Sequence, residues 1–399
     1  MTLDPVFDVV VVGGGPAGAT AALELARQGH HVALLDRGGR VKPCGGAVPP
    51  CLLPDFDVPQ DLLAARIRAA RIMSPSGRMV DMPIDGGFVG MVDRARFDPW
   101  LRRRAEAVGV VSCPGRFLRI DRDGQTLPRV VYRSAYAAGV EPELGLRALA
   151  VIGADGALSQ VARQEIPGRG PQKVVFAYHE ILRSPLDGVA GYDGSRCDIV
   201  YDGEVSPDFY GWIFPHGATL SIGVGSARKG FGLRRSVAAL RRRSGLADCT
   251  LLREEGAPIP AHPLKVWDNG KDVVLAGDAA GVVAPASGEG IFYAMTGGRL
   301  AAEAVHAFLE SGDPRALGQA RRRFMKTHGL VFRILGAMQY FWYGSDARRE
   351  RFVAMCADPD VQRLTWEAYM NKRLSRTRPG AHLRILVQDI AHLLGFQRT

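Results

Sequence analysis

The first 36 residues carry the apolar pattern of a strand, a helix and a second strand. Residues 9–12 (VVVV) form a short continuous apolar run, which is typical of a buried strand in a parallel sheet. Glycines follow, and an Ala- and Leu-rich segment of helical character then continues to Gly29. Residues 31–36 (HVALLD) predict the second strand. The pattern therefore predicts a strand–helix–strand unit.

Glycine spacing gives this unit a chemical meaning. Gly13-x-Gly15-x-x-Gly18 lies between the first strand and the helix. Gly13 permits the tight turn, Gly15 lets a pyrophosphate approach the backbone, and Gly18 lets the helix pack close to the strand. Asp36, at the tip of the second strand, can accept ribose hydroxyls, and the helix N-terminus faces the phosphates. The unit therefore predicts a dinucleotide cradle.

Two later segments add a strand, a small-residue loop and a helix each. Residues 150–163 (AVIGADGALSQVAR) predict a strand, a turn at Asp155–Gly156 and a helix start. Residues 272–305 predict a strand that ends at Gly277–Asp278, a loop of small residues and a long helix. Either segment alone is an ordinary turn and helix cap, and only the order of all three motifs favours a cofactor site.

The region between these segments predicts successive strands, over 174–183, 196–203, 209–217 and 219–227. In 209–217 (FYGWIFPHG), Tyr210, Trp212 and Phe214 alternate, so on a strand they share one face. Three aromatic side chains on one face form either the core face of a sheet or the wall of an apolar cavity.

The stretch KPCGGAVPP, residues 42–50, combines glycines, which allow many backbone conformations, with prolines, which allow few. Gly45 and Gly46 let the backbone approach a ring or a substrate closely, whereas the three prolines reduce the freedom of the loop. Cys44 supplies a small, weakly acidic side chain that either donates a proton or fills space.

Composition narrows the class of protein. Hydrophobic residues make up 47% and charged residues 23%, which indicates a globular chain. The net charge of +10 suits anionic partners or solvated helix faces, but no aromatic platform accompanies the basic runs, so we expect no nucleic-acid binding. Six scattered cysteines without a CxxC pair indicate neither a metal site nor a disulfide framework. An N-terminus without signal-peptide features predicts a cytoplasmic protein.

The three motifs together resemble the superfamily of FAD-dependent hydroxylases and reductases with the p-hydroxybenzoate-hydroxylase-like fold. By that resemblance Asp278 would bind ribityl hydroxyls or the pyrophosphate, and residues 285–290 would line the isoalloxazine ring. Arg94, just before a predicted helix, would lie near FAD, whereas we expect solvated side chains for Arg102, Arg103 and Arg104. The resemblance assigns FAD contacts to the following residues: Gly13, Gly15, Pro16, Ala17, Gly18, Asp36, Arg37, Cys44, Gly45, Gly46, Arg94, Ala154, Asp155, Gly156, Gly277, Asp278, Pro285, Gly288, Gly290 and Ile291.

Pro-Cys-Gly-Gly together with the YxWxFP strand resembles the geranylgeranyl reductase family, most of all its (bacterio)chlorophyll branch. The likeness covers nearly the whole chain, including the tail from residue 361 onward. It implies that Tyr210, Trp212, Phe214 and Pro215 wall a long isoprenoid cavity and that the Cys44 loop lies by the flavin. Aromatic hydroxylases usually have a histidine where this chain has Gly281, and Gly-Gln-Gly where it has Gly288-Glu289-Gly290.

The resemblance implies FAD-dependent reduction of three isolated double bonds of a geranylgeranyl chain to phytyl. The substrate would be geranylgeranyl-(bacterio)chlorophyll or geranylgeranyl diphosphate, the electron donor NADPH or ferredoxin, and the proton donor Cys44 or Tyr210. The alternatives are a flavin monooxygenase and a non-catalytic, flavin-containing assembly factor.

Basic residues 321–326, aromatic residues 340–344 and an apolar stripe over 380–394 suit peripheral attachment to a membrane, or packing on the protein itself.

The sequence therefore predicts an α/β fold with three parts. A Rossmann-like FAD-binding domain would comprise residues 1–75, 91–165 and 265–320. A β-sheet-rich substrate domain would comprise 76–90 and 166–264, and a helical C-terminal region would follow over 321–399.

Overall fold

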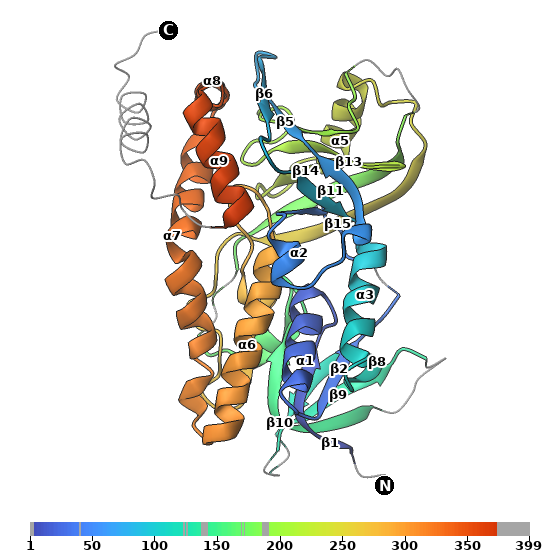
Figure 1. Ribbon diagram of the computed structural model, residues 1–399, viewed down its shortest axis with the longest axis vertical. Helices are drawn as coiled ribbons and strands as arrows, with labels where there is room; N and C mark the ends of the chain where they lie inside the picture. The colour runs from blue at the N-terminus through green and yellow to red at the C-terminus, as the bar shows by residue number, and fades with distance from the viewer. Residues whose placement is uncertain are drawn as a thin grey trace. The chain divides into compact units, whose positions relative to one another are not determined.

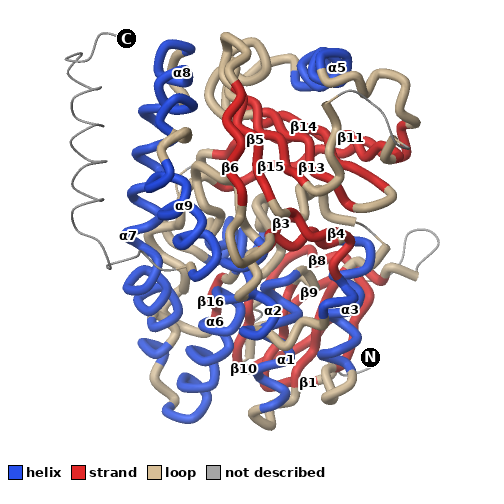
Figure 2. Tube along the Cα trace, turned by 45° about the horizontal axis from the view of Figure 1, so that its top comes forward, coloured by secondary structure: helices blue, strands red, loops and turns tan. Residues whose placement is uncertain are grey.

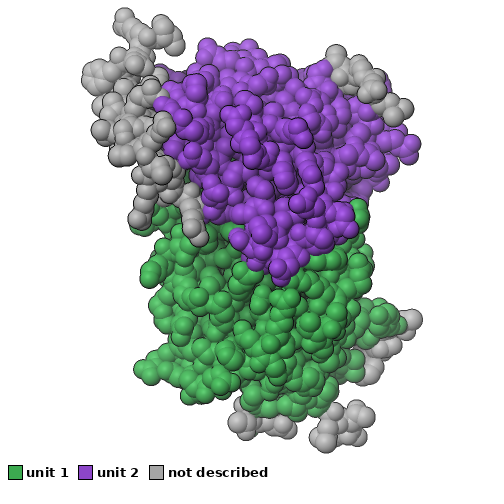
Figure 3. Space-filling view, viewed as in Figure 1, with its two compact units in different colours: residues 1–44, 94–175, 258–336 green, residues 45–93, 176–257, 337–399 purple. Residues whose placement is uncertain are grey.

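The computed structural model describes residues 4–39, 41–122, 124, 127–136, 143–168, 170, 172–185 and 191–372. The chain divides into two compact units, coloured separately in Figure 3. Unit 1 comprises residues 1–44, 94–175 and 258–336, and unit 2 comprises 45–93, 176–257 and 337–399. The chain therefore passes between the units repeatedly, and one of these crossings follows Cys44.

Unit 1 combines a mainly parallel sheet with helices (Figures 1 and 2). Its strands are β1 (Val6–Val12), β2 (Val32–Asp36), β8 (Val111–Asp121), β9 (Arg129–Ser134), β10 (Leu144–Gly153) and β16 (Val273–Leu275). Its helices are α1 (Pro16–Arg27), α3 (Arg94–Glu106), α4 (Gln160–Glu165), α6 (Ile291–Ser311), the larger part of α7 (Gln319–Trp342) and the short 3₁₀ helices Gly277–Ala280 and Pro314–Ala316.

The predicted strand–helix–strand unit forms the centre of this sheet. β1 pairs in parallel with β2 on one side and with β10 on the other, while β8 and β16 extend the parallel sheet. β9 runs antiparallel to β8 and β10. The valines at 9–12 are buried, as the continuous apolar run predicts, and α1 packs against α3 and α6. This arrangement brings the carboxyl ends of β1, β2, β10 and β16 to one edge, where ligands bind in such sheets.

Unit 2 is rich in strands. They are β3 (Ala47–Val48), β4 (Leu63–Ile67), β5 (Ala69–Met73), β6 (Met79–Pro83), β7 (Val89–Val92), most of β11 (Val174–Arg183), β12 (Arg196–Val200), β13 (Gly211–His216), β14 (Thr219–Ser226) and most of β15 (Leu251–Pro260). Its helices are α2 (Leu52–Asp55), the 3₁₀ helix Gln60–Leu62, α5 (Leu233–Arg243), the end of α7, α8 (Asp346–Met355) and α9 (Pro359–Asn371).

A seven-stranded sheet in the order β15-β11-β14-β13-β12-β5-β6 organises unit 2. Ile213 of β13 lies in a buried cluster with Val237 and Leu240 of α5, so α5 covers one face. Phe214, which points the other way, packs with Met91 of the three-stranded sheet β3-β7-β4 and with side chains of α9. The β13 side chains therefore alternate between the two faces of the sheet.

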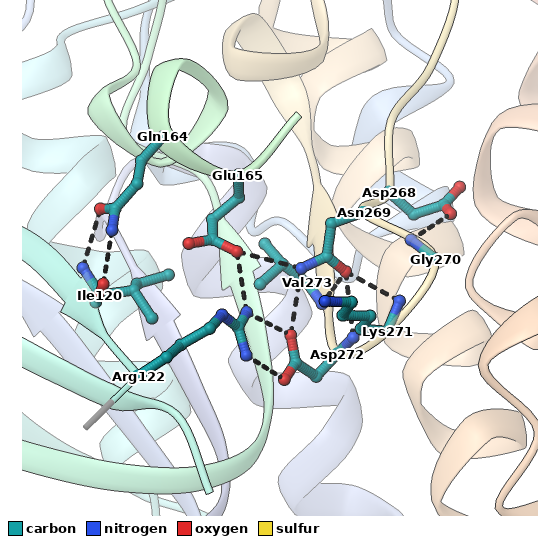
Figure 4. Close-up of polar contacts among 10 residues, drawn as sticks. All are labelled: Ile120, Arg122, Gln164, Glu165, Asp268, Asn269, Gly270, Lys271, Asp272 and Val273. Atoms are coloured by element: carbon teal, nitrogen blue, oxygen red, sulfur yellow. Dashed lines mark hydrogen bonds and ion pairs between the residues drawn. The ribbon is translucent and has the colours of Figure 1, made fainter. Parts of the chain in front are cut away.

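A polar cluster ties three segments of unit 1 together (Figure 4). Arg122, just after β8, makes two hydrogen bonds to Asp272, with N–O distances of 2.8 and 2.7 Å, and one of 2.8 Å to Glu165. Asn269 donates to both carboxylates, at 3.0 Å to Glu165 and 3.1 Å to Asp272. The cluster fixes the end of α4 and the turn before β16, the strand that leads to Asp278.

The four strands predicted over 174–227 are confirmed as β11 to β14, whereas the compact units have other bounds than the predicted domains. Residues 45–75 belong to unit 2, because β5 forms a hairpin with β6 and pairs with β12, which is far away in the sequence. Most of the predicted tail, including the stripe over 380–394, lies outside the described residues. Among the residues that the structure describes, no helix is long and apolar enough to cross a bilayer.

Candidate functional site: a dinucleotide cradle and an aromatic wall

The turn between β1 and α1 is shaped by backbone packed against backbone. Gly13 has a φ of +105°, and a Cβ added there would lie 2.3 Å from the carbonyl oxygen of Ala154. A Cβ added at Gly18 would lie 1.8 Å from the carbonyl oxygen of Gly13. Gly15, by contrast, has open space where its Cβ would be, and as the N-cap of α1 it provides no side-chain cap. The first N–H groups of α1 are thus available to an anionic ligand.

Asp36 stands at the edge of this turn, as predicted. Its two carboxylate oxygens accept hydrogen bonds from the backbone N–H groups of Gly14, at 2.7 Å, and Gly38, at 2.9 Å. A carboxylate oxygen can accept more than one bond, so Asp36 can still receive ribose hydroxyls. The neighbouring Arg37 is exposed.

Arg102 departs from the prediction of a solvated side chain. Its guanidinium donates to the carbonyl oxygen of Gly14 at 3.1 Å and lies 3.8 Å from Asp36. Arg102 therefore supports the cradle from α3. The basic run 101–105 does not show this contact, because the helical pattern does not indicate which of three consecutive arginines turns inward.

The Ala-Asp-Gly segment braces the cradle from β10. The backbone N–H of Ala154 donates to the carbonyl oxygen of Val12 at 2.8 Å, beside the Gly13 turn. Asp155 accepts hydrogen bonds from Ser159, at 2.5 Å, and from the N–H of Gln160, at 2.6 Å, at the start of α4. Burial raises the pKa of Asp155, and these hydrogen bonds oppose the increase. The carboxylate thus fastens α4 in place.

Asp278 lies where the 3₁₀ helix follows β16, and its carboxylate is paired. Lys42 Nζ is 2.5 Å from Asp278 Oδ2, and the Asp278 side chain is only 12% exposed. Gly277 precedes it with a φ of +62°, a conformation that favours glycine. Lys42 begins the KPCGG stretch, yet its pairing was not predicted, since the two residues are far apart in sequence.

The loop over 285–290 is closed by its own backbone. The N–H of Ala284 donates to the carbonyl of Glu289, and the N–H of Gly288 donates back to the carbonyl of Ala284, each at 2.9 Å. Pro285 is buried, and Ile291 begins α6 after Gly290, which provides no side-chain cap. A second helix N-terminus without a side-chain cap thus lies beside Asp278, whose Oδ1 would lie 3.8 Å from a Cβ added at Gly290.

Arg94 connects the start of α3 with Cys44. Its guanidinium is buried and holds Asp98 with N–O distances of 2.6 and 2.7 Å. It also makes a side-chain hydrogen bond with Cys44. Burial by itself would lower the pKa of Arg94, but the Asp98 carboxylate and Cys44 together raise it above its usual value. A permanent positive charge therefore lies beside the Cys44 sulfur.

Gly45 and Gly46 continue this loop in unit 2, tightly against β13. Gly46 has a φ of +76°, and a Cβ there would lie 2.5 Å from both His216 Nε2 and the Val92 carbonyl oxygen. A Cβ at Gly45 would lie 3.1 Å from the Phe214 ring. Burial lowers the pKa of His216, against opposing backbone hydrogen bonds. Gly46 is thus required by its backbone conformation and its close contacts, and Gly45 lies directly against the aromatic strand.

The aromatic residues of the predicted wall are neighbours in space. The ring centroids of Tyr210 and Trp212 lie 6.1 Å apart, and those of Trp212 and Phe214 lie 6.2 Å apart. Tyr210 and Trp212 are buried, as is Pro215. The alternation in sequence therefore produces a continuous row of rings.

The residues of unit 1 fit a flavin adenine dinucleotide. Two helix N-termini without side-chain caps offer N–H groups to anionic oxygens, and the open space at Gly15 admits a phosphate. Asp36 and Asp278 supply carboxylates that suit the hydroxyls of a ribose and of a ribityl chain. Fold and donor set together define an FAD-dependent oxidoreductase, and residues 8–47 match the family described as FAD dependent oxidoreductase.

Within this class, the chain belongs to the geranylgeranyl reductase family. It is 56% identical to the geranylgeranyl diphosphate reductase of Rhodobacter capsulatus over 98% of both chains. It is 35% identical to the chloroplastic geranylgeranyl diphosphate reductase of Oryza sativa, over 97% of this chain and 86% of that protein. A geranylgeranyl bacteriochlorophyll reductase-like structure from Thermoplasma acidophilum shares the fold, with a TM-score of 0.80 at 20% identity over 96% of both chains. The predicted family, fold class and FAD dependence are confirmed.

Proposed function

We propose that this chain reduces three isolated double bonds of the geranylgeranyl tail of a (bacterio)chlorophyll, which gives a phytyl tail, and that free geranylgeranyl diphosphate is a second substrate. The reductase activity on geranylgeranyl chains follows from the family, and the identity of 56% to a geranylgeranyl diphosphate reductase supports it most directly. The pigment ester as substrate is tested by incubation with geranylgeranylated bacteriochlorophyll.

The aromatic row supports the choice of an isoprenoid substrate. When FAD is bound, its reduced flavin supplies a hydride. An isolated alkene has no carbonyl to accept negative charge, so a proton must reach the neighbouring carbon with the hydride or before it. Positive charge then develops on the substituted carbon, and the ring faces of Tyr210, Trp212 and Phe214 can stabilise it while they exclude water.

Cys44 is the proton donor that the surroundings favour. Its thiol proton would pass to one alkene carbon while the hydride adds to the other, and a thiolate would remain. The buried Arg94 guanidinium, already hydrogen-bonded to Cys44, would stabilise that thiolate until solvent returns the proton. Tyr210 is the other candidate, and its ring packs against those of Phe209, Tyr201 and Trp212.

Cys44→Ala tests this role. We expect tail reduction to fall by about two orders of magnitude, the usual scale for loss of a positioned acid, while the flavin is still reduced at the normal rate. Cys51→Ala, a second cysteine of intermediate burial in the same stretch of chain, should change neither rate. Normal tail reduction in Cys44→Ala would remove Cys44 from the mechanism.

The electron donor is proposed to be NADPH or reduced ferredoxin. The net charge of +10 suits an acidic donor protein such as ferredoxin. Salt would screen the attraction between the two proteins, so flavin reduction by ferredoxin should be slower at high salt. Anaerobic mixing with each donor, monitored by bleaching of the flavin absorbance, distinguishes the two. Bleaching by neither would favour a non-catalytic assembly factor.

The substrate is tested by anaerobic incubation of the FAD-loaded protein with reductant and geranylgeranylated bacteriochlorophyll. Mass analysis should show successive gains of two hydrogens, confined to the tail and ending after the third. Parallel incubation with geranylgeranyl diphosphate compares the two substrates. A hydroxylated product with substrate-dependent oxygen consumption in air would instead establish a monooxygenase.

A further inference from the structure

A line of hydrogen-bonded polar groups lies behind Trp212 in unit 2. Trp212 Nε1 donates to Ser221 Oγ at 3.1 Å, and Ser221 Oγ is 2.9 Å from His179 Nδ1. His179 Nε2 in turn lies 3.2 Å from Glu255 Oε2. The four residues come from β13, β14, β11 and β15, which are consecutive neighbours in the seven-stranded sheet. Ser221 and His179 are 0% and 3% exposed, so these bonds are shielded from water.

The chemistry of the four side chains determines which group donates and which accepts in each hydrogen bond of the line. Glu255 is an acceptor, so the neutral imidazole of His179 that fits this line has its proton on Nε2 and leaves Nδ1 as an acceptor. The Ser221 hydroxyl then donates to Nδ1, and its oxygen accepts the indole N–H of Trp212. Every polar atom in the line has a partner, and Arg253 contacts the second oxygen of Glu255. Removal of one member would leave a buried polar group unsatisfied, which is costly.

Packing against Gly223 fixes the plane of the Trp212 indole ring. The hydrogen bond to Ser221 then fixes how the ring is oriented within that plane. A Cβ added at Gly223 would lie 2.2 Å from Trp212 Cζ2 and 2.6 Å from His179 Cβ, so the ring lies directly over the glycine. Apolar contacts resist tilting but do not fix which ring edge points where. The one polar atom of the indole does, because its N–H must reach Ser221.

We propose that Ser221, His179 and Glu255 are positioning residues that fix the Trp212 ring and thereby the course of the isoprenoid tail along the aromatic wall. The proposal rests on the proposed function. A geranylgeranyl tail repeats the same unit, so each double bond has to be brought to one reacting position. A wall with one fixed orientation favours that alignment, whereas a ring that turns permits misaligned binding.

Ser221→Ala removes the acceptor of the Trp212 N–H. We expect about tenfold slower tail reduction, with accumulation of partly reduced tails, while flavin reduction by the donor is unchanged. Ser221→Thr, which keeps the hydroxyl, should restore complete reduction. Ser236→Ala is the matched control, because Ser236 is also buried in unit 2 but donates to the carbonyl of Val205. An equal effect of Ser236→Ala would mean general loosening of the unit and would overturn the proposal.

A double-mutant cycle separates positioning of Trp212 from other roles of the serine. In Trp212→Phe there is no N–H to hold, so a further Ser221→Ala change, although it also removes the donor to His179 Nδ1, should not raise the share of partly reduced tails any further. Additive effects would overturn the proposal. Glu255→Gln, at the partly exposed end of the line, gives a milder test in case the buried variants fold poorly, and it should also raise the share of partly reduced tails. A wild-type protein that reduces no geranylgeranyl tail would instead contradict the proposed function.

Discussion

Lys42 is the residue whose contact most directly concerns the cofactor. It neutralises Asp278, a carboxylate beside the N-terminus of α6 that would otherwise repel the diphosphate of FAD. We expect Lys42→Met to weaken FAD binding by roughly tenfold, the effect of about 1.4 kcal/mol. Titration of the FAD-free protein, followed by flavin fluorescence, measures the change.

Lys42→Arg is the matched control, because it keeps the positive charge and should bind FAD almost normally. Unchanged affinity in Lys42→Met would show that the pair has no part in cofactor binding. Equal weakening in both variants would point to the shape of the lysine side chain and not to its charge.

Residues that act through their own backbone could be predicted, and residues that act through distant partners could not. Gly13 and Gly18 are visible in the sequence because a turn and a close helix require them at fixed spacing. Arg102 and Lys42 hold cradle residues across 88 and 236 positions of the chain. No local sequence pattern predicts these long-range contacts, because the partners come together only when the sheet forms.

At the scale of elements, strand alternation predicted the aromatic row but not what supports it. The period of two places Trp212 and Phe214 on one face of β13. The line from Ser221 to Glu255 depends on the order of strands β13, β14, β11 and β15, in which β11 and β15 are separated by long connections. Strand order follows from tertiary packing, so the sequence alone did not reveal it.

The Arg122 cluster predicts a pH-dependent contribution to stability. Burial alone would raise the pKa of Asp272, but hydrogen bonds from Arg122 and Asn269 lower it below its usual value. A lowered folded-state pKa means that this contribution is complete above the unfolded value, about 3.9, and is lost as the pH falls through the folded value. Arg122→Gln should therefore cost about 1 kcal/mol at neutral pH, a discounted figure because the Arg122 side chain is 38% exposed.

Urea unfolding of wild type and Arg122→Gln at several pH values checks this prediction. The difference in unfolding free energy should be constant from neutral pH down to about pH 4 and should shrink below it. Arg119→Gln, at an exposed ion pair on β8, the strand just before Arg122, should have a much smaller effect. A difference that grows on acidification would contradict the assigned sign.

At the scale of the whole molecule, α7 carries a surface suited to a lipid bilayer. The helix has five cations and no carboxylate. Phe324 and Phe332 are buried, whereas Leu330 and Ile334 are exposed at 52% and 40%. Of the aromatic residues 340–344, Tyr340 is exposed but Trp342 and Tyr343 are buried, so only part of that predicted membrane contact is available. We propose that the Leu330–Ile334 face rests on an anionic membrane that holds the pigment substrate.

Leu330→Ser/Ile334→Ser should weaken co-sedimentation with vesicles of phosphatidylcholine and phosphatidylglycerol by about tenfold, because each exposed side chain forfeits on the order of 1 kcal/mol of apolar burial. The rate of reduction of a substrate tail dissolved in detergent should be unchanged, because Leu330 and Ile334 are exposed to solvent. The control is Leu251→Ser/Leu252→Ser, which removes a similar exposed area, 45% and 48%, from β15. If both double variants bind vesicles equally well, α7 does not form the contact. If detergent activity falls as well, the exposed leucine and isoleucine serve the fold and not the membrane.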